Sequence, residues 1–424
     1  MTPEIKQQIE QIRRGEVPEG FKHNSASVMP CDWNTCDFHE VATIQSGLVS
    51  PKEEPYCFMF HIGPDNIERD TGRIGNLKTA CELGLVSGKF YFDAGSIVYS
   101  KIRPNLNKVC IPNFEGICSA DCYSIKARAG IDRDYLFNLM LSFPFYRRAV
   151  ACSMRTGMPK INQDDLNAIP VVMPSQLEEQ QKIAAILTTQ DKVIELKEKL
   201  LAEKQRQKKY LMQVLLTGKK RLPRFSGEWK VNRLRNIATR HTKRNTIGNT
   251  NALTISAQYG LINQAEFFNK AVASDDKSNY FLLEKGDFAY NKSYSNGYPF
   301  GAIKRLTRYE VGIVSPLYIC FRIKEGSVSG EYLEQYFEAG LMNHEIQAFA
   351  QEGARNHGLL NIAVDDFFNS KILLPSPEEQ TSIAEIFSTA DREIDLLRQD
   401  IEQEKQKKKA LMQLLLTGIV RVNE

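Results

Sequence analysis

The chain has 424 residues, of which 42% are hydrophobic and 25% are charged, and its formal net charge is +4. This composition is ordinary for a folded globular protein and excludes a disordered chain. No apolar run reaches the ~18 residues that would span a membrane, and residues 1–20 show a charged helical pattern rather than a signal peptide. We therefore expect a cytoplasmic protein without a membrane segment. The mild positive charge does not by itself indicate nucleic-acid binding.

Residues 21–173 predict a first globular domain, which follows the N-terminal helical segment 1–20. Trp33 comes after a proline-containing loop near the start of this domain. The turn glycine Gly95 precedes a short predicted strand, and the end of that strand carries a basic loop that begins at Lys101. Asp134 begins an amphipathic helical pattern, and a strand over 169–173 closes the domain. About 150 residues are enough to bury a hydrophobic core.

Residues 174–218 predict one long helix. The helix opens with a proline and a serine, followed by Glu178 and Glu179 in the first turn, where the helix dipole favours negative charge. It ends at Gly218, a residue suited to the left-handed conformation that terminates helices. The start and stop signals thus define one helical element of about 40 residues.

The remaining half of the chain repeats this plan. Residues 219–374 predict a second globular domain with the same landmarks, including Trp229, a turn glycine before a strand that ends at Lys292, and a closing strand over 371–374. Residues 375–424 predict a second long helix. Without a gap, 19 of the 41 positions in 178–218 are identical in 378–418. The sequence therefore predicts an α+β protein with two similar α/β domains and two long helices, related by a pseudo-twofold repeat.

Each long helix carries an apolar stripe, so each needs a partner helix. In the second copy the apolar positions alternate in spacings of 4 and 3, which is typical of a coiled-coil seam. An intermolecular coiled coil is one possible arrangement, but the presence of both copies in one chain favours an intramolecular antiparallel pair. We expect the contacts Ile194–Ile401 and Leu201–Ile394 near its centre. The seam also contains polar positions, which are Gln190, Lys197, Lys204, Lys208, Glu404 and Lys408.

The order of these segments resembles a known family. A diverged globular domain, a helix of the pattern P…EEQ…I…LMQ…LLTG, a second diverged domain and a second such helix are similar to type I restriction–modification specificity subunits. The likeness covers the chain from about Val17 to Gly418, and the segment from Arg224 to Trp229 also looks like that family.

This resemblance implies a non-catalytic subunit that recognises double-stranded DNA. Each globular domain would be a target recognition domain that reads one half of a split DNA sequence. The helices would set the spacing of the two domains and dock two adenine-methyltransferase subunits, and restriction/translocase subunits would join them. The chain itself would carry no cofactor, because S-adenosylmethionine, ATP and Mg²⁺ would bind only to the partner subunits.

Candidate DNA-binding residues lie in polar and basic loops where the two domains differ. Base edges are read by Arg, Lys, Asn, Gln and Ser, and Arg and Lys also contact phosphates. In the first domain the candidates are Lys101, Arg103, Asn105, Asn107, Lys108, Arg155 and Lys160. In the second domain they are Arg240, Lys243, Arg244, Lys292, Ser295, Asn296, Arg355 and Asn356.

Other charged segments are interpreted separately from these loops. The run from Lys219 to Asn245 is either a solvated domain boundary or a phosphate-facing patch. The lysine-rich runs 204–209 and 405–409 are interpreted as solvated or partner-facing helix surface. The acidic pairs at 164–165 and 365–366 are interpreted as helix or turn caps rather than as catalytic carboxylates.

Eight of the nine cysteines lie in the first half of the chain, and no two CxxC-like pairs occur at zinc-finger spacing. We therefore expect buried reduced thiols and no metal. The sequence also lacks the Asn/Asp-Pro-Pro-aromatic clamp of an adenine methyltransferase. A silent or decoy specificity variant is an alternative that the sequence leaves open. A fused methyltransferase or nuclease subunit is a weaker alternative, because no catalytic motif is present.

Overall fold

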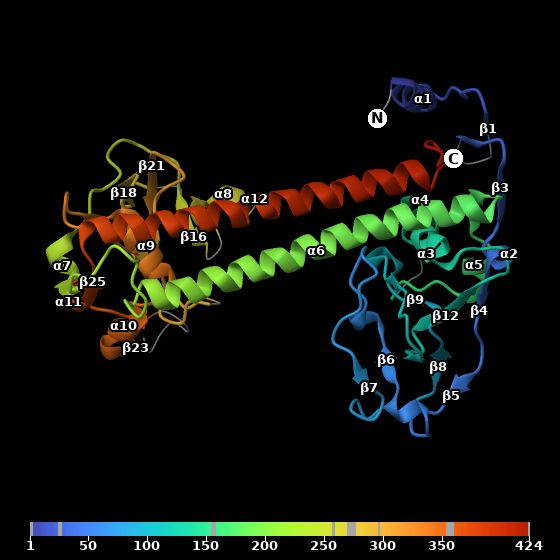
Figure 1. The fold of residues 1–424 in the computed structure, drawn as a ribbon, viewed down its shortest axis with the longest axis horizontal. Coiled ribbons are helices and arrows are strands. Elements are labelled where there is room, and N and C mark those ends of the chain that lie inside the picture. Colours follow the sequence, from blue (N-terminus) through green and yellow to red (C-terminus); the bar gives the residue numbers. More distant parts are fainter. Residues whose placement is uncertain are drawn as a thin grey trace. The chain divides into compact units, whose positions relative to one another are not determined.

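The computed structural model describes residues 3–23, 28–153, 158–256, 259–268, 277–295, 297–352 and 360–422 (Figure 1). The chain forms two compact units. The first contains Met1–Glu198 and Asp400–Glu424, and the second contains Lys199–Gln399. Each unit therefore combines one globular domain with a segment of each long helix. The domain boundaries at 173–174, 218–219 and 374–375 stay predictions.

The first unit begins with the helix α1 (Pro3–Arg13) and the hairpin of β1 (Phe21–His23) and β2 (Val28–Pro30). No side chain of α1 is buried. The domain proper is then framed by an antiparallel pair, β3 (Trp33–Asp37) with β13 (Pro170–Pro174). This pair joins the first and last strands of the domain, so it brings Trp33 next to the start of the long helix.

Two sheets fill the first domain. The four-stranded sheet has the order β10-β9-β12-β4, with the strands Val109–Cys110, Ile97–Ser100, Cys122–Ala127 and Ala42–Ile44. The five-stranded sheet has the order β5-β8-β11-β6-β7, with the strands Leu48–Val49, Lys89–Phe92, Gly116–Cys118, Phe60–Ile62 and Lys78–Thr79. The helices are α2 (Phe38–Val41), α3 (Arg133–Leu141), α4 (Phe143–Cys152) and α5 (Gln163–Asn167), with 3-10 turns η1 (Tyr56–Phe58), η2 (Pro64–Asn66) and η3 (Pro104–Leu106).

The second unit repeats this frame. Its framing pair is β14 (Lys230–Arg233) with β25 (Lys371–Leu374). Its four-stranded sheet has the order β15-β22-β19-β20, with the strands Ala238–Arg240, Ile319–Ile323, Phe288–Asn291 and Ala302–Arg305. The other strands are β16 (Leu253–Ser256), β17 (Gly260–Asn263), β18 (Phe281–Glu284), β21 (Val311–Val314), β23 (Gln351–Glu352) and β24 (Leu360–Asn361), and the short helices are α7 (Leu234–Ile237), α8 (Gln264–Phe268), α9 (Gly330–Glu338), α10 (Asn343–Phe349) and α11 (Val364–Asn369). Each domain thus has its own framing pair and its own four-stranded sheet, with the same strand order in both domains.

The acidic pairs lie in the first turns of α5 and α11, as expected for residues at helix starts. Asn162, and not either aspartate, is the N-cap of α5, and its side chain accepts a hydrogen bond from the N–H of Asp165. In α11 the N-cap is Ala363, which makes no side-chain capping bond, so both acidic pairs lie at helix starts but neither pair supplies the cap.

The two long helices have equal lengths and equal ends. α6 spans Leu177–Leu215 and α12 spans Pro377–Leu415, each with 39 residues. Gly218 and Gly418 adopt φ values of 70° and 72°, the left-handed conformation predicted for the helix stops. At Gly418 a Cβ atom would lie 2.5 Å from Pro30 Cγ, so the close approach of the chain to Pro30 also requires glycine.

Hydrogen bonds and ion pairs confirm the antiparallel intramolecular pairing of these helices (Figure 1). In the first unit, Gln190 donates to Glu404 at 2.7 Å and Lys197 donates to Asp400 and Glu404 at 2.8 Å. Residue numbers therefore rise along α6 as they fall along α12. Hydrogen bonds from Lys197 and Gln190 lower the pKa of Glu404 to about 2. These bonds flank Ile194 and Ile401, which are both buried.

The second unit shows the same pairing. Lys208 Nζ lies 2.6 Å from Asp391 Oδ1, and Lys204 Nζ lies 2.8 Å from Glu393 Oε2. Ile394 is buried and Leu201 is half-buried. The specific contacts Ile194–Ile401 and Leu201–Ile394 stay predictions, although the register of the surrounding bonds agrees with both.

Several lysines of the runs 204–209 and 405–409 pair with the opposite long helix of the same chain. Lys204 and Lys208 pair with α12, and Lys405 and Lys408 pair with Glu198 and Asp191 of α6. The Lys408–Asp191 and Lys208–Asp391 distances are both 2.6 Å, so the repeat forms the same ion pair once in each unit. The polar positions of the seam are therefore filled by complementary charges that fix the register.

Reversing one of these charges should weaken the helix pair. In Lys208→Glu, two carboxylates would face each other in a mostly buried seam, so we expect the second unit to lose about 1–2 kcal/mol of unfolding free energy. The double variant Lys208→Glu/Asp391→Lys should recover most of this loss in urea denaturation. Reversal of the exposed pair Glu203–Arg206 serves as a control and should be nearly neutral. An absence of recovery in the double variant would contradict the assigned register.

Candidate nucleic-acid interface

Two of the predicted DNA-binding segments of the first domain lie side by side. Ile102 forms a β-bridge with Lys160, and the N–H of Arg103 donates to the carbonyl of Pro159 at 2.8 Å. Arg103 is exposed, and its φ of 49° lies in the left-handed region, which non-glycine residues rarely adopt. Such conformations concentrate at functional sites, because the surrounding structure must hold them in place.

Lys101 lies against aromatic rings at the base of this surface. Its Nζ is 5.0 Å from the centroid of the Tyr123 ring and 5.9 Å from that of Phe90. Burial and the neighbouring charge of Lys160 lower the pKa of Lys101. Lys101, Arg103 and Lys160 thus bring three positive charges together from two segments that are about 60 residues apart in the sequence.

The other candidates of this loop differ in accessibility. Asn105 is exposed, whereas Asn107 is only 7% exposed and its Nδ2 donates to Asp70 and to the carbonyl of Leu141, both at 3.1 Å. Lys108 Nζ donates to the carbonyl of Pro64. Asn107 and Lys108 therefore hold the loop in place in this structure, and their contact with DNA stays a prediction. Arg155 lies outside the described residues.

In the second domain, Lys292 and Ser295 lie in the loop that follows β19. Tyr298 anchors this loop, because its hydroxyl donates to Glu338 at 2.7 Å. Lys304, on the adjacent strand β20, donates to both Tyr298 and Glu338. Side chains thus help to hold the loop in both domains, but the residues and their partners differ. Asn296, Arg355 and Asn356 lie outside the described residues.

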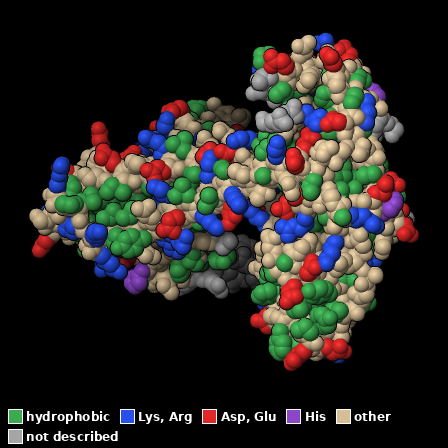
Figure 2. Space-filling view, turned by 45° about the vertical axis from the view of Figure 1, so that its right-hand side comes forward, with side chains coloured by type: hydrophobic (Ala, Val, Ile, Leu, Met, Phe, Trp, Pro, Cys, Tyr) green, Lys and Arg blue, Asp and Glu red, His purple; other side chains and the backbone are tan. Residues whose placement is uncertain are grey.

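The remaining basic candidates of the second domain lie on or after β15. Arg240, Lys243 and Arg244 are exposed. Lys243 Nζ lies 3.5 Å from Glu284, and Arg244 donates to Asn279. On the face drawn in Figure 2, basic and acidic side chains alternate, and no single basic face stands out. DNA contact by these residues stays a prediction.

The sequence analysis missed the residues that close each domain onto a long helix. The Glu379 side chain, only 1% exposed, accepts hydrogen bonds from Arg221 Nε and Nη2 at 2.7 Å and from Trp229 Nε1 at 3.2 Å. Glu179 accepts the same set of bonds in the first unit, from Arg421 at 2.8 and 2.9 Å and from Trp33 at 3.3 Å. We call each set of Glu, Arg and Trp a domain lock.

The glutamine after each of these glutamates also has a repeated role. Gln180 accepts from the N–H of Asp132, the N-cap of α3, at 2.9 Å. Gln380 accepts from the N–H of Ser329, the N-cap of α9, at 3.0 Å. The repeated Glu-Glu-Gln motif was the available signal, but it predicted only a helix start. Arg221 is part of a domain lock, so for this residue of the basic run 219–245 neither the solvated nor the phosphate-facing reading applies.

Three of the eight cysteines of the first domain are buried, and the expectation of buried thiols is wrong for Cys31, Cys81 and Cys152, which are exposed. Cys110, Cys118 and Cys122 belong to one hydrophobic core, and burial raises the pKa of the Cys118 thiol to about 12. Thiols with such pKa values stay protonated near neutral pH. Among the residues that the structure describes, no group of three or more His, Cys, Asp or Glu side chains is placed to hold a metal ion.

Comparison with known proteins decides the family. The model of the type I restriction modification DNA specificity domain matches residues 30–205 and again residues 226–406. The chain belongs to this family. The two matches correspond to the two domains and their helices, so the chain carries two copies of the specificity domain. The family is one of DNA sequence recognition and not of catalysis.

Curated relatives carry the same description. The chain is 41% identical over 181 residues to the EcoDI type I restriction enzyme specificity subunit of Escherichia coli, an alignment that covers 43% of this chain and 38% of that protein. It is 26% identical over 334 residues to the MjaVIII specificity subunit of Methanocaldococcus jannaschii, which covers 73% of this chain and 75% of that protein.

Solved structures share the fold at low sequence identity. The HsdS subunit from Thermoanaerobacter tengcongensis matches 93% of this chain with a TM-score of 0.50 and 19% identity. A chain from a study of complex assembly in a type I restriction–modification system matches 92% with a TM-score of 0.58 and 17% identity. No helix among the described residues is long and apolar enough to cross a membrane.

Proposed function

We propose that this specificity subunit reads a bipartite DNA target, with one half-site recognised by each domain. The observation that carries this proposal is a repeated frame with different loops. Both units have the same four-stranded sheet order, the same framing pair and the same domain lock, whereas the loops after β9 and β19 differ in sequence and in how they are held. With a shared frame and diverged polar loops, each domain can recognise the base edges of its own half-site independently of the other domain.

The paired helices are the proposed spacer and docking platform. A helix of 39 residues is about 58 Å long at 1.5 Å per residue. This length is enough to set two half-sites one helical turn of DNA or somewhat more apart. Two adenine-methyltransferase subunits would dock on the helices, and restriction/translocase subunits would join them.

The chemistry of the complex would then reside in the partners. S-adenosylmethionine, ATP and Mg²⁺ would bind to those subunits, and this chain would bind only DNA and proteins. The proposed location is the cytoplasm. Mapping N6-methyladenine in a host that expresses the chain with its modification subunit tests the function. We expect a split motif, and methylation of a continuous motif would contradict the proposal.

Arg103 is the proposed base-reading residue of the first half-site. A bidentate arginine–guanine contact contributes about 1–3 kcal/mol, so Arg103→Ala should reduce methylation at the cognate motif by roughly 5- to 150-fold or relax one position of one half-site. Methylome mapping and binding assays at several salt concentrations measure both effects. Arg69→Ala is the matched control, because Arg69 is an exposed arginine of the same domain that pairs with Asp70. Unchanged methylation in Arg103→Ala would exclude this role.

A further inference from the structure

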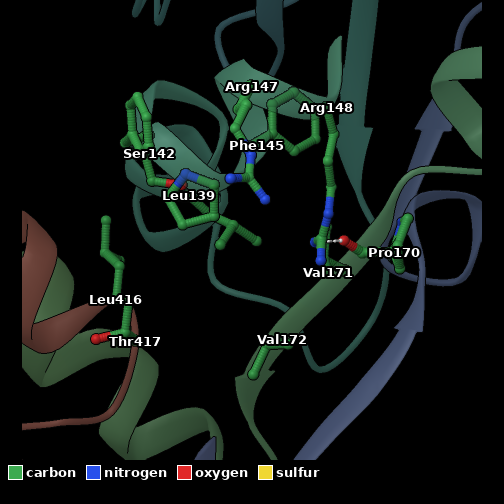
Figure 3. A pocket seen from close by; sticks show the side chains of 12 residues that line it. Leu139, Ser142, Phe145, Arg147, Arg148, Pro170, Val171, Val172, Leu416 and Thr417 are labelled. Atoms are coloured by element: carbon green, nitrogen blue, oxygen red, sulfur yellow. Dashed lines mark hydrogen bonds between the residues drawn. The ribbon is translucent and has the colours of Figure 1, made fainter. Parts of the chain in front are cut away.

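The first unit contains a cavity of about 200 Å³ that none of the domain-lock residues lines (Figure 3). It is formed where the end of α3, the first turns of α4, the strand β13 and the end of α12 meet. Most of its walls are apolar. The lining residues are Leu139, Ser142, Phe143, Pro144, Phe145, Arg147, Arg148, Pro170, Val171, Val172, Leu416 and Thr417.

Two consecutive arginines of α4 face this cavity, and none of the lining residues is acidic. Figure 3 shows the guanidinium groups of Arg147 and Arg148 pointing from α4 toward β13 and the end of α12. Arg148 donates to the carbonyl of Pro170, and burial together with the charge of Arg147 lowers its pKa. Arg147 is exposed and Arg148 is half-buried, and the repulsion between these neighbouring like charges favours a bound anion.

Ser142 adds an unused hydrogen-bonding group at the same place. It is the N-cap of α4 and is only 3% exposed. Its hydroxyl makes no capping bond, and its Oγ has no hydrogen-bond partner among the described residues. Buried hydroxyls are nearly always hydrogen-bonded in folded proteins, so this group is available to a ligand or a water molecule.

The second unit does not share this arrangement. The helix α10 follows α9 there as α4 follows α3, but counting from the N-caps Asp132 and Ser329, His344 and Glu345 stand where the first unit has Arg147 and Arg148. Near the closing strand the charge is even reversed, because Glu345 accepts from the N–H of Lys371 at 2.8 Å. The cationic cavity therefore belongs to the first domain alone and not to the pseudo-twofold frame.

We propose that this cavity is an anion site that takes a carboxylate attached to an apolar group. Arg147 and Arg148 would bind the carboxylate, Ser142 would donate its hydroxyl, and the apolar walls would hold the body of the ligand. A volume of about 200 Å³ equals about seven water molecules and lies below the ~300–1,000 Å³ of typical cofactor sites. The site thus suits a small organic acid or an acidic side chain of a partner protein, and it is too small for a nucleotide.

Phenylacetate is a suitable probe, and the neutral phenylacetamide is its matched control. Calorimetric titration of the full chain should detect saturable binding of phenylacetate in the millimolar range and at least tenfold weaker binding of phenylacetamide. Arg147→Gln should weaken phenylacetate binding about tenfold or more, because a charge-assisted hydrogen bond is lost. Ser142→Ala should weaken binding with no loss of thermal stability, since the hydroxyl stabilises nothing in the free protein. Arg235→Gln, at an exposed arginine of the second unit, should change neither property.

Equal binding of phenylacetate and phenylacetamide, or no saturable binding of phenylacetate by the folded chain, would overturn the proposal. So would full phenylacetate affinity in Arg147→Gln. Repetition of the titration on the complex with the modification subunit distinguishes the two sources of the carboxylate. Loss of probe binding on assembly assigns the site to an acidic side chain of the partner, and retained binding assigns it to a free organic acid. None of these outcomes depends on DNA recognition.

Discussion

Replacing Arg421 with alanine should destabilise the first unit by about 2–4 kcal/mol, although only three residues follow it in the sequence. Arg421 donates to Glu179 at 2.8 and 2.9 Å and to Asp32 at 2.8 and 2.6 Å. The pKa of Asp32 is lowered, mainly by its hydrogen bond from Arg421. Without the guanidinium group, the Glu179 carboxylate, whose side chain is 11% exposed, would stay in a mostly buried position without its counter-charge.

Urea denaturation together with hydrogen exchange resolved by unit would measure this effect. Protection should fall in the first unit and stay unchanged in the second. The pseudo-twofold repeat supplies a matched variant, Arg221→Ala, which should destabilise the second unit alone because Arg221 pairs with Glu379. Glu178→Ala, at the exposed neighbour of Glu179, should be nearly neutral. Equal loss of protection in both units after either arginine substitution would contradict the assignment of one domain lock to each unit.

Exchange of the second domain for that of another specificity subunit should change one half of the methylated sequence and leave the other half intact. The structure indicates where the junctions belong. Exchange of residues 234–370 keeps the framing pair β14–β25, Arg221, Trp229 and Glu379 in the host chain. The exchanged loops would then determine the half-site sequence, whereas α6 and α12 of the host chain would still determine the spacing between the half-sites.

Methylome mapping of the hybrid reads this outcome directly, because a complete replacement of three or more base pairs changes affinity by several kcal/mol. The reciprocal exchange of residues 38–169 should alter the other half-site alone. A hybrid that changes both half-sites would show that the domains do not read independently. A hybrid that methylates the original motif would place recognition outside the exchanged residues.

Much of the frame was predictable from the sequence because it depends on local signals. The ends of α6 and α12 follow from proline, glutamate and glycine positions, their apolar spacing predicts a coiled-coil seam, and the duplication within one chain favours an antiparallel pair. The repeated Trp33/Trp229 and Gly95/Gly286 landmarks predict two domains with one fold. These inferences rest on helix capping and on side-chain periodicity, which act over a few residues and are therefore readable along the chain.

The roles of individual polar side chains were decided by the tertiary structure. The sequence places Lys208 and Lys408 at seam positions, but only the fold shows that Asp391 and Asp191 lie opposite them. Asn107 looks like a base-reading residue, but the fold surrounds its amide with Asp70 and Leu141. In each case the partner lies more than 30 positions away in the sequence, so no local pattern encodes the pairing.

The residues of the domain lock and of the cationic cavity were also brought together only by the tertiary structure. Arg421 pairs with Asp32 across 389 positions, and Arg147 and Ser142 meet Leu416 only because the end of α12 packs beside α4 and β13. The sequence by itself determined the repeated helices, the two-domain plan and the family, because these follow from local periodicity and repetition. Only the tertiary structure decided which charges are paired, buried or without a counter-charge, because the energy of a charge depends on its three-dimensional surroundings.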